Sequence, residues 1–514
     1  MLVKTYGSAV NGVEAITISI EVNITNGTQT FLVGLPDNAV KESMLRVETA
    51  IKAIGYFMPR TRVVINMAPA DIRKTGTAFD LPIAIGILAA TEQIINLEPL
   101  QNWVFCGELG LDGSLQPIRG ALPMALTARK EKFSGMVVPV QNAAEAAVVD
   151  KLPVMGIRSL TEAIQLVEDP IRARPHLPGI EQWFNEPPGL EAGDFSDVKG
   201  QENIKRAMEI AAAGGHNLLL IGPPGAGKTM LARRFPGILP PLTLDEALET
   251  TRIHSVAGKL TTGTALVQQR PFRQPHHTIS HMAMAGGGSN PLPGEISLAH
   301  NGVLFLDELP EFNRTVLEVM RQPMEERKLT ISRARISVEF PAAFMLVASM
   351  NPCPCGYYNH PEKECSCPPG AVQKYLQKIS GPLLDRIDLQ LEVTPVPFQN
   401  LSSSSRSESS REIRNRVIQA RQVQARRFNE IKGIYCNAQM NSRQLEQNCS
   451  LGSSSRQLLK TAMERLKLSA RAYDRILKMA RTIADLSQNE LILPEHIAEA
   501  IQFRSLDRDN WGWK

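Results

Sequence analysis

The stretch that decides the fold is His216–Arg234, HNLLLIGPPGAGKTMLARR. It predicts a strand, a glycine-rich turn and the start of a helix, in that order. The turn fits the phosphate-loop pattern G-x-x-x-x-G-K-[ST] with Gly222, Pro223, Pro224, Gly225, Ala226, Gly227, Lys228 and Thr229. Glycines let backbone N–H groups point at phosphate oxygens, and the helix that follows adds its positive end. We therefore expect Lys228 to reach the β- and γ-phosphates of ATP and the Thr229 hydroxyl to hold Mg²⁺.

An acidic motif supplies the second half of this site. Residues 302–306 predict an apolar strand, and Asp307 and Glu308 follow it directly. Asp307 is expected to hold the magnesium shell, and Glu308 to orient and deprotonate the attacking water. The next strand ends at Asn351, whose amide would lie beside the γ-phosphate and sense it. A chance glycine turn followed by two surface acids is the alternative, which the strand–turn–helix context disfavours.

The rest of the chain divides into three blocks joined by two linkers. Residues 1–168 predict a mixed α/β domain, and residues 195–397 predict an α/β domain with a parallel sheet around the phosphate loop. Residues 411–514 predict a C-terminal helical domain. Proline is frequent in 169–194 and serine in 398–410, so we expect both segments to be linkers. The predicted fold class is therefore α/β with a helical lid.

Hydrophobic periodicity places individual elements inside these blocks. Near-continuous apolar runs indicate strands of a sheet buried on both faces at 217–221, 302–306 and 343–348. In the first block the pattern predicts strands at 15–22 and 62–67 and helices at 43–54 and 143–149. Near the C-terminal end, 458–486 predicts two helices, the second from about Ala472, and Pro494 opens a last one.

Composition and charge exclude few classes of protein. Of 514 residues, 43% are hydrophobic and 21% charged, as in ordinary globular proteins, and the formal net charge is +4. This mild excess permits a nucleic-acid partner without arguing for one. The first residues lack the layout of a signal peptide, and the apolar run Leu81–Ala90 is too short to cross a bilayer. We expect a cytoplasmic protein with no membrane partner.

Taken together, the motifs resemble a known family. The phosphate loop, the acidic motif, Asn351 as sensor 1, LDRID at 384–388 and SARA at 469–472 are similar to the magnesium-chelatase group of AAA+ ATPases. Within that group the whole chain resembles the YifB/ComM proteins. The stretches that carry this closer resemblance are RPFRQPHHT at 270–278, PGEISLAHNG at 293–302 and NPCPCG at 351–356.

The resemblance implies roles for two arginines. Arg386 would act as an arginine finger on ATP in the neighbouring subunit, and Arg471 as the sensor 2 arginine. A guanidinium is always charged and offers a planar fork to phosphate oxygens. A finger that acts in trans requires a homo-oligomer, and a hexameric ring is the family expectation. An ordinary salt bridge is the alternative for each arginine.

The N-terminal block resembles the proteolytic domain of Lon-type proteases at 74–82 (KTGTAFDLP) and 107–113 (GELGLDG). A serine–lysine protease needs a nucleophile and an amine that takes its proton. The serine position holds Ala78, and the lysine position falls in 120–124, which contains no lysine. We therefore expect a domain without peptidase activity, with Thr77 as the nearest hydroxyl, that holds subunits together or grips a substrate.

Four of the seven cysteines crowd onto one loop: Cys353, Cys355, Cys365 and Cys367. Four thiolates suit a structural Zn²⁺ with tetrahedral geometry, which would rigidify the loop after sensor 1. The spacing differs from the usual C-x-x-C pairs. His360 is an alternative ligand, and a set of reduced thiols without metal is the other interpretation.

Two basic segments are candidates for DNA contact. Residues 328–340 alternate apolar and polar positions and predict a hairpin that resembles, in its place along the chain, the pre-sensor 1 hairpin of ring translocases. Arg333 and Arg335 would then contact DNA phosphates in the pore, and a solvated turn is the alternative. Residues 411–427 carry six arginines and one acid, which predicts either a solvated basic helix or a surface for duplex DNA.

The loop at His276 and His277 has two interpretations. It is either a hydrogen-bonded turn or a contact in the pore or between subunits. A metal site there is disfavoured because no acids lie nearby in the sequence.

The resemblance implies an ATP-dependent DNA motor. Such a ring would drive branch migration on single-stranded, forked or branched DNA, during integration of transforming DNA or recombination. Two other classes stay open: a chelatase-type motor, and a protein-remodelling machine of the chaperone or protease type. The Lon-like block, the cysteine loop and the basic hairpin are not features of the chelatase motor subunit, and the protease reading depends on the N-terminal fold alone.

Overall fold

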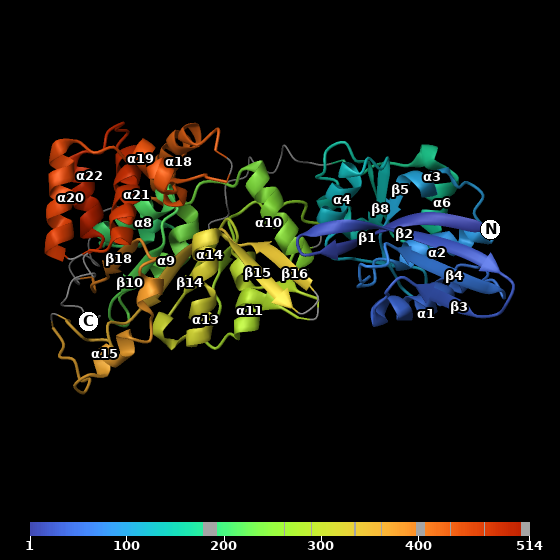
Figure 1. Ribbon diagram of the computed structural model, residues 1–514, viewed down its shortest axis with the longest axis horizontal. Helices are drawn as coiled ribbons and strands as arrows, with labels where there is room; N and C mark the ends of the chain where they lie inside the picture. Colours follow the sequence, from blue (N-terminus) through green and yellow to red (C-terminus); the bar gives the residue numbers. More distant parts are fainter. Residues whose placement is uncertain are drawn as a thin grey trace.

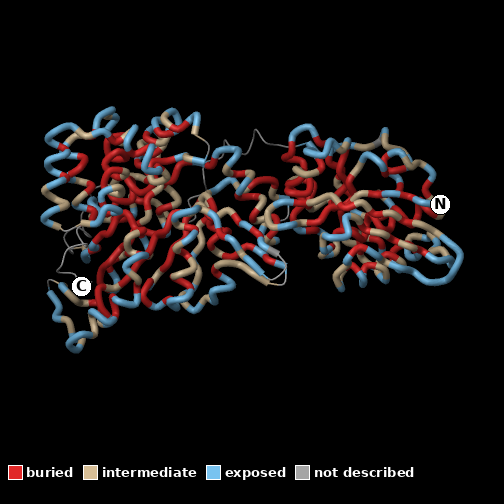
Figure 2. The backbone as a smooth tube through the Cα atoms, viewed as in Figure 1, coloured by how far each residue is buried: buried red, intermediate tan, exposed pale blue. Residues whose placement is uncertain are grey.

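The computed structural model describes residues 1–177, 193–261, 263–288, 290–333, 336–360, 362–396, 407–431, 433–466 and 468–504. Three domains follow one another along the longest axis of the molecule, from the N-terminal domain on the right of Figure 1 to the helical domain on the left. The N-terminal domain has a buried interior of its own, and the central and helical domains share another (Figure 2). The predicted fold class, two α/β domains followed by a helical region, is confirmed.

The N-terminal domain is built on a seven-stranded mixed sheet of order β3-β4-β2-β1-β5-β8-β9. Its strands are β1 (Leu2–Asn11), β2 (Glu14–Thr25), β3 (Thr30–Val33), β4 (Arg62–Ala68), β5 (Trp103–Phe105), β8 (Gly135–Pro139) and β9 (Val154–Ile157), with a small hairpin of β6 (Glu108–Leu109) and β7 (Leu115–Gln116). Its helices are α1 (Asn38–Ala53), α2 (Asp80–Ala90), α3 (Glu98–Asn102), α4 (Ala121–Lys130), α5 (Val140–Ala146) and α6 (Leu160–Glu168).

Alternation of apolar and polar residues in the sequence explains most of the strands of this domain. On β2 the residues Ile18, Ile20 and Val22 are fully buried and their neighbours are less so, which is the period of a strand with one covered face. The predicted strands at 15–22 and 62–67 lie in β2 and β4, and the predicted helix at 43–54 lies in α1. The helix expected at 143–149 begins three residues earlier, directly after β8, because a proline closes that strand.

The central domain has a five-stranded, all-parallel sheet of order β11-β14-β17-β10-β18. Its strands are β10 (Leu218–Ile221), β11 (Phe272–Arg273), β14 (Val303–Leu306), β17 (Met345–Met350) and β18 (Leu389–Glu392). Two hairpins project from it, β12 (Gly286–Gly287) with β13 (Leu292–Pro293), and β15 (Lys328–Arg333) with β16 (Ile336–Pro341). The helices are α8 (Glu202–Gly214), α9 (Lys228–Arg234), α10 (Leu244–Val256), α11 (His281–Ala285), α12 (Glu295–Leu298), α13 (Arg314–Val319), α14 (Arg321–Glu326), α15 (Ala371–Leu376) and α16 (Gly381–Leu384).

Burial on both faces of this sheet follows from its apolar strands. Every residue of β10, β14 and β17 is buried, and alternate residues belong to two different apolar cores. The strand predictions at 217–221 and 302–306 are confirmed to within a residue. The third strand begins at Met345, two residues later than predicted, and the predicted hairpin at 328–340 is confirmed as β15–β16.

The helical domain consists of α18 (Ser410–Arg427), α19 (Ser442–Asn448), α20 (Ser453–Leu466), α21 (Ala470–Leu486) and α22 (Pro494–Gln502). Helix α21 begins two residues before the predicted start, and Pro494 does open the last helix. Apolar residues of α18 and α21 join one core with α8 and the outer face of the parallel sheet. The helical domain is therefore packed onto the central domain rather than tethered to it.

Parts of both expected linkers lie outside the described residues, namely 178–192 and 397–406. The end of the serine-rich segment is not a flexible joint. Ser409 caps α18, the Ser410 hydroxyl accepts a hydrogen bond of 2.8 Å from the Phe195 N–H, and the Ser407 hydroxyl donates to the Val198 carbonyl at 2.9 Å. Serine is a good helix cap, so composition alone could not separate linker from cap here.

Candidate nucleotide site

The phosphate loop joins β10 to α9 at the carboxyl edge of the parallel sheet. Gly225 and Gly227 have φ values of +80° and +86°, in the left-handed region that favours glycine. A Cβ at Gly222 would lie 2.2 Å from the Val393 carbonyl oxygen of the neighbouring chain segment. Backbone conformation therefore requires glycine at 225 and 227, and the close approach of Val393 requires it at 222. No atom lies within 4 Å of a Cβ placed on Gly225, so the space beside the loop is open.

Lys228 lies in the mouth of this loop. Its Nζ donates to the carbonyl oxygens of Gly222 and Pro223 at 2.7 and 2.9 Å and to Asn351 Oδ1 at 3.1 Å. Burial lowers the pKa of Lys228, while the nearby acidic motif opposes that shift. The ammonium group thus stands between the phosphate loop and the predicted sensor residue, where a γ-phosphate would be held.

The oxygen ligands for a magnesium ion are already together. The Thr229 hydroxyl donates to Asp307 Oδ2 at 2.7 Å, and the Ser349 hydroxyl donates to Asp307 Oδ1. Carboxylate and hydroxyl oxygens are suitable ligands for Mg²⁺. Thr229 and Asp307 would therefore hold the ion, while Ser349 fixes the carboxylate from the next strand. This role of Ser349 could not be predicted from the sequence, because only the pairing of β14 with β17 brings its hydroxyl to Asp307.

Glu308 has a backbone conformation that is unusual for its residue type. Its φ is +56°, a left-handed value, and its side chain is 57% exposed at the edge of the site. Such conformations cost on the order of 1 kcal/mol or more and persist where the surrounding structure imposes them. The turn follows β14 directly, and Glu308 lines a cleft together with Asn351, the residue that accepts a hydrogen bond from Lys228.

His277 is the neighbour of this carboxylate that the sequence did not reveal. Its Nδ1 lies 3.7 Å from Glu308 Oε2, although 31 positions separate the two residues. The His277 ring packs on His276 with centroids 4.1 Å apart and meets the edge of Phe312 at 6.4 Å. The expectation that no acid lies near this histidine loop is wrong, because the acid comes from another strand.

A cleft in front of the site has a basic wall. Glu308 and Asn351 line it on one side, and Lys374, Tyr375 and Lys378 on the other. Lys378 is paired with Glu311 at 3.3 Å. The lysines come from the segment around α15, for which the sequence predicted neither structure nor function. Glu311 also lines the cleft, so its two lysines face two acids, and Lys374 is the lysine there without a recorded ion pair among the described residues.

Arg386 lies at the opposite edge of the sheet. Its carbonyl oxygen accepts from Asn217 Nδ2 at 2.9 Å, just before β10 begins, whereas the phosphate loop starts where β10 ends. Four extended residues span about 13 Å. The Arg386 side chain is 8% exposed and is paired with Glu325 of its own chain. Within one chain, therefore, Arg386 does not contact the phosphate loop.

Arg471 is placed differently from Arg386. Its side chain is 63% exposed and its Nη1 lies 3.9 Å from Asp385 Oδ2. The SARA motif thus meets the LDRID motif, because α21 begins beside the segment that leads into β18. The ordinary salt bridge considered for Arg386 and Arg471 is present within one chain for each, with Glu325 and with Asp385, and the neighbouring Arg475 is bound to Asp388.

The four clustered cysteines are brought together in space. Their Sγ atoms all lie within 4.8 Å of one another, with Cys353–Cys355 at 3.3 Å and Cys355–Cys365 at 3.5 Å. Four sulfurs about 2.3 Å from a central Zn²⁺ would be separated by about 3.8 Å, so the cluster fits such an ion. His360 is not part of this cluster, since its Nδ1 accepts from the N–H groups of Glu362 and Lys363 at 3.1 Å.

The candidate DNA contacts differ in whether the structure describes them and in whether their arginines are exposed. Arg333 is exposed near the end of β15, whereas Arg335 lies outside the described residues. On α18 several arginines are engaged inside the protein: Arg416 binds Glu209 and Glu408, and Arg427 binds Asp485. The basic charge of 411–427 is therefore partly neutralised inside the protein, while Arg411 and Arg426 stay exposed, and neither the solvated lid surface nor the duplex-DNA surface is decided by this.

The Lon-like region of the N-terminal domain presents no serine–lysine pair. Ala78 belongs to the same buried apolar cluster as Ala121 and Leu122. The Thr77 hydroxyl donates to a carboxylate oxygen of Glu108. The positions that would hold a nucleophile and its amine are thus filled by apolar side chains.

None of the helices in the described part of the chain is long and apolar enough to span a membrane.

Known proteins match the chain along its length. The family described as "Magnesium chelatase, subunit ChlI" matches residues 194–401, "Subunit ChlI of Mg-chelatase" matches 20–142, and the ChlI C-terminal family matches 407–504. Competence protein ComM of Haemophilus influenzae is 43% identical over 522 residues, covering 99% of this chain and 98% of that protein. YifB of Escherichia coli is 43% identical over 500 residues, with 97% and 96% covered. Lon protease 2 of Bacillus subtilis is 31% identical over 159 residues, 28% of this chain and 27% of that protein.

Proposed function

We propose a function from one premise: the chain belongs to the ComM/YifB family of magnesium-chelatase-like AAA+ ATPases. Membership implies ATP hydrolysis. Our proposal is that this ATPase forms a hexameric ring that moves on DNA and drives branch migration. The observation that carries it is the 43% identity, over 99% of the chain, to a protein named for competence. Competence is the uptake of DNA by cells, so a DNA substrate follows more directly than a porphyrin or a protein.

The residues at the carboxyl edge of the sheet would divide the chemistry between them. Lys228 and the loop N–H groups bind and orient the phosphates, and Asn351 contacts the γ-phosphate. Glu308 takes the proton of the attacking water. Thr229 and Asp307 would hold Mg²⁺, which when bound neutralises charge on the β- and γ-phosphates.

The position of Arg386 supports a ring. At the amino edge of the sheet it cannot serve the ATP of its own chain, but it could reach the ATP of a neighbour docked against that edge. It would first have to leave Glu325. Exchange of one ion pair for a phosphate contact would couple hydrolysis to subunit contact. Arg471, exposed beside Asp385, is proposed to sense the nucleotide from the helical domain.

Two hairpins offer a surface for the DNA. In Figure 1, β15–β16 projects from the central domain toward the N-terminal domain. The Arg333 guanidinium would lie 3.7 Å from a Cβ placed on Gly287, so the tips of β15–β16 and β12–β13 are neighbours. We propose that Arg333 and Arg335 contact backbone phosphates there.

We also propose a structural Zn²⁺ on Cys353, Cys355, Cys365 and Cys367. Metal analysis of protein purified without chelator should give about one zinc per chain. Cys365→Ser should release most of it, whereas Cys436→Ser, a change of a buried thiol outside the cluster, should not. Wild-type protein with far less than one zinc would contradict the proposal.

The DNA assignment is tested by the stimulation of ATP turnover. Forked DNA should raise the rate several-fold, and Arg333→Gln with Arg335→Gln should weaken this effect and flatten its dependence on salt. Lys328→Gln is the control, because Lys328 at the hairpin base is paired with Glu339 at 2.8 Å. Stimulation by unfolded protein alone would favour a remodelling machine, and stimulation only by a chelatase partner subunit would favour the chelatase class.

A further inference from the structure

A second basic pocket lies at the amino edge of the parallel sheet, away from the phosphate loop. It has a volume of about 330 Å³, within the range of small-ligand sites. It is walled by the starts of β10, β14 and β17 on one side and by α18, α21 and residues 435–441 of the helical domain on the other. Its charged lining consists of Glu246, Arg270, Glu325, Arg327, Asp388, Arg421, Arg475 and Lys478.

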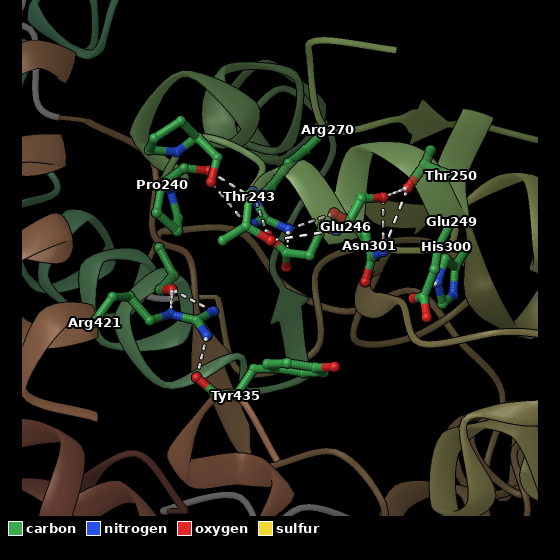
Figure 3. Close-up of polar contacts among 12 residues, drawn as sticks. Pro240, Thr243, Glu246, Glu249, Thr250, Arg270, His300, Asn301, Arg421 and Tyr435 are labelled. Atoms are coloured by element: carbon green, nitrogen blue, oxygen red, sulfur yellow. Dashed lines mark hydrogen bonds and ion pairs between the residues drawn. The ribbon is translucent and has the colours of Figure 1, made fainter. Parts of the chain in front are cut away.

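The acids of this lining are already engaged. Glu246 makes a two-point contact with Arg270, at 3.0 and 2.8 Å, as Figure 3 shows. Asp388 binds Arg475, and Glu325 binds Arg386. Among the described residues, none of these carboxylates forms an ion pair with Arg327, Arg421 or Lys478, although Asp388 and Asp474 attract Lys478 at longer range and Glu246 attracts Arg421.

Within the described part of the chain, those three cations donate their hydrogen bonds to main-chain oxygens. Arg421 donates to the carbonyl of Ala212, at 3.2 and 3.3 Å, and to that of Tyr435 at 3.4 Å (Figure 3). Arg327 donates to the Gly433 carbonyl at 3.1 Å, and Lys478 to the Ala438 carbonyl at 3.2 Å. Carbonyl dipoles satisfy donors, and a helix end such as that of α8 carries about half a charge. They cannot neutralise three cations.

The backbone also holds one of these cations in place. Arg327 has φ +58°, a strained left-handed value, at the point where α14 turns into β15. Burial lowers the pKa of Arg327 and that of Lys478; for Lys478 the neighbouring Arg475 and Arg327 add to this shift, while Asp388 and Asp474 oppose it. Burial thus disfavours the charged forms of both side chains, and an anion bound beside them would favour those forms.

We propose that this pocket binds a phosphate-bearing anion at Arg327, Arg421 and Lys478. Guanidinium forks and an ammonium are the usual ligands of phosphate oxygens. The cavity fits a free phosphate compound up to about the size of a mononucleotide, and Tyr435 at its rim is 55% exposed. Because Arg327 precedes the β15–β16 hairpin and Arg421 lies on α18, the anion would join the hairpin base to the helical domain.

The test uses the full chain with Lys228→Ala, which disables the phosphate loop, and inorganic pyrophosphate at low salt without magnesium. Calorimetry should show one site per chain. Arg421→Gln and Lys478→Gln should each weaken binding by about tenfold, as expected for loss of a charged hydrogen bond. Arg426→Gln, an exposed position on the same helix, should leave it unchanged.

Two results would overturn the proposal. One is no heat of binding with the Lys228→Ala chain, and the other is binding that survives both pocket substitutions. Lys478→Gln alone decides the matter if Arg421→Gln fails to fold. A 12-nucleotide single strand added as competitor separates the two sources of phosphate. If it displaces pyrophosphate, the pocket binds the DNA backbone; if pyrophosphate stays bound, the pocket binds a free anion. Neither readout depends on ATP turnover, so the proposal can fail separately from the DNA motor.

Discussion

At the scale of single residues, the nucleotide site is a set of side chains that hold one another in position. Asp307 receives hydroxyl hydrogen bonds from Thr229 and Ser349, and Lys228 reaches Asn351. Glu308 is left half-exposed on a left-handed turn, and among the described residues His277 Nδ1, 3.7 Å away, is the recorded polar neighbour of its carboxylate. A carboxylate held this way can accept a proton and also change position.

We expect Glu308→Gln to separate binding from turnover. The amide keeps the shape of the side chain but cannot take a proton, so kcat should fall by about a hundredfold or more while ATP binding is kept. Glu311→Gln is the matched control, because Glu311 lies three residues on and is paired with Lys378. Steady-state turnover and equilibrium binding of ATP measure the two effects. Near-wild-type turnover in Glu308→Gln would remove the assignment of the base.

We expect His277→Ala to act through Glu308. Loss of the imidazole 3.7 Å away frees the carboxylate to adopt other positions, so kcat should fall by about tenfold with little change in KM for ATP. His281→Ala, at the exposed start of α11, should leave both constants unchanged. In the background of Glu308→Gln the His277 substitution should have no further effect, and an additive loss would show that His277 acts elsewhere.

At the scale of elements, the sequence predicted the helices, strands and loops that depend on residues close together in the chain. Glycines, the strand–turn–helix order and apolar runs sufficed for β10, β14 and the phosphate loop, and a proline for the start of α22. It could not show contacts made through the sheet. Ser349 meets Asp307 only through strand pairing, and His277 meets Glu308 only because its loop folds over the end of β14. Two of the acids that neutralise α18 come from α8 and α21, far away in the sequence, so the count of arginines in 411–427 overstates the positive charge at the surface.

The cysteine loop touches the phosphate loop directly, which gives a prediction for one glycine. Gly356 has φ +86°, and a Cβ there would lie 2.5 Å from Pro224 Cδ. Gly356→Ala should displace the phosphate loop and raise the KM for ATP by about tenfold, with zinc content unchanged. Gly370→Ala is the control, because Gly370 has a similar φ of +77° and no atom within 4 Å of a Cβ. Equal effects of the two changes would mean that backbone strain, and not contact, is responsible.

At the scale of the whole molecule, each chain carries its phosphate loop and Arg386, the arginine proposed as a finger, at opposite edges of one sheet. Asp388, buried at the amino edge, anchors that edge: burial alone would raise its pKa, but Arg475 and His216 hold the pKa well below the ordinary range. The helical domain supplies Arg475, so the edge that would face a neighbour is built jointly by two domains. A rigid edge of this kind can transmit the state of one ATP to the next subunit.

Mixing two inactive chains tests this arrangement. Arg386→Ala alone should lower ATP turnover by at least about a hundredfold, as for loss of an arginine finger, and Lys228→Ala should abolish it. Their mixture should regain part of the activity, because a chain that keeps Lys228 then meets a neighbour that keeps Arg386. A mixture of Arg386→Ala with a chain carrying both substitutions should regain none. If the first mixture also stays inactive although both chains assemble to the same size, Arg386 acts within its own chain through Glu325, and the active site does not span two subunits.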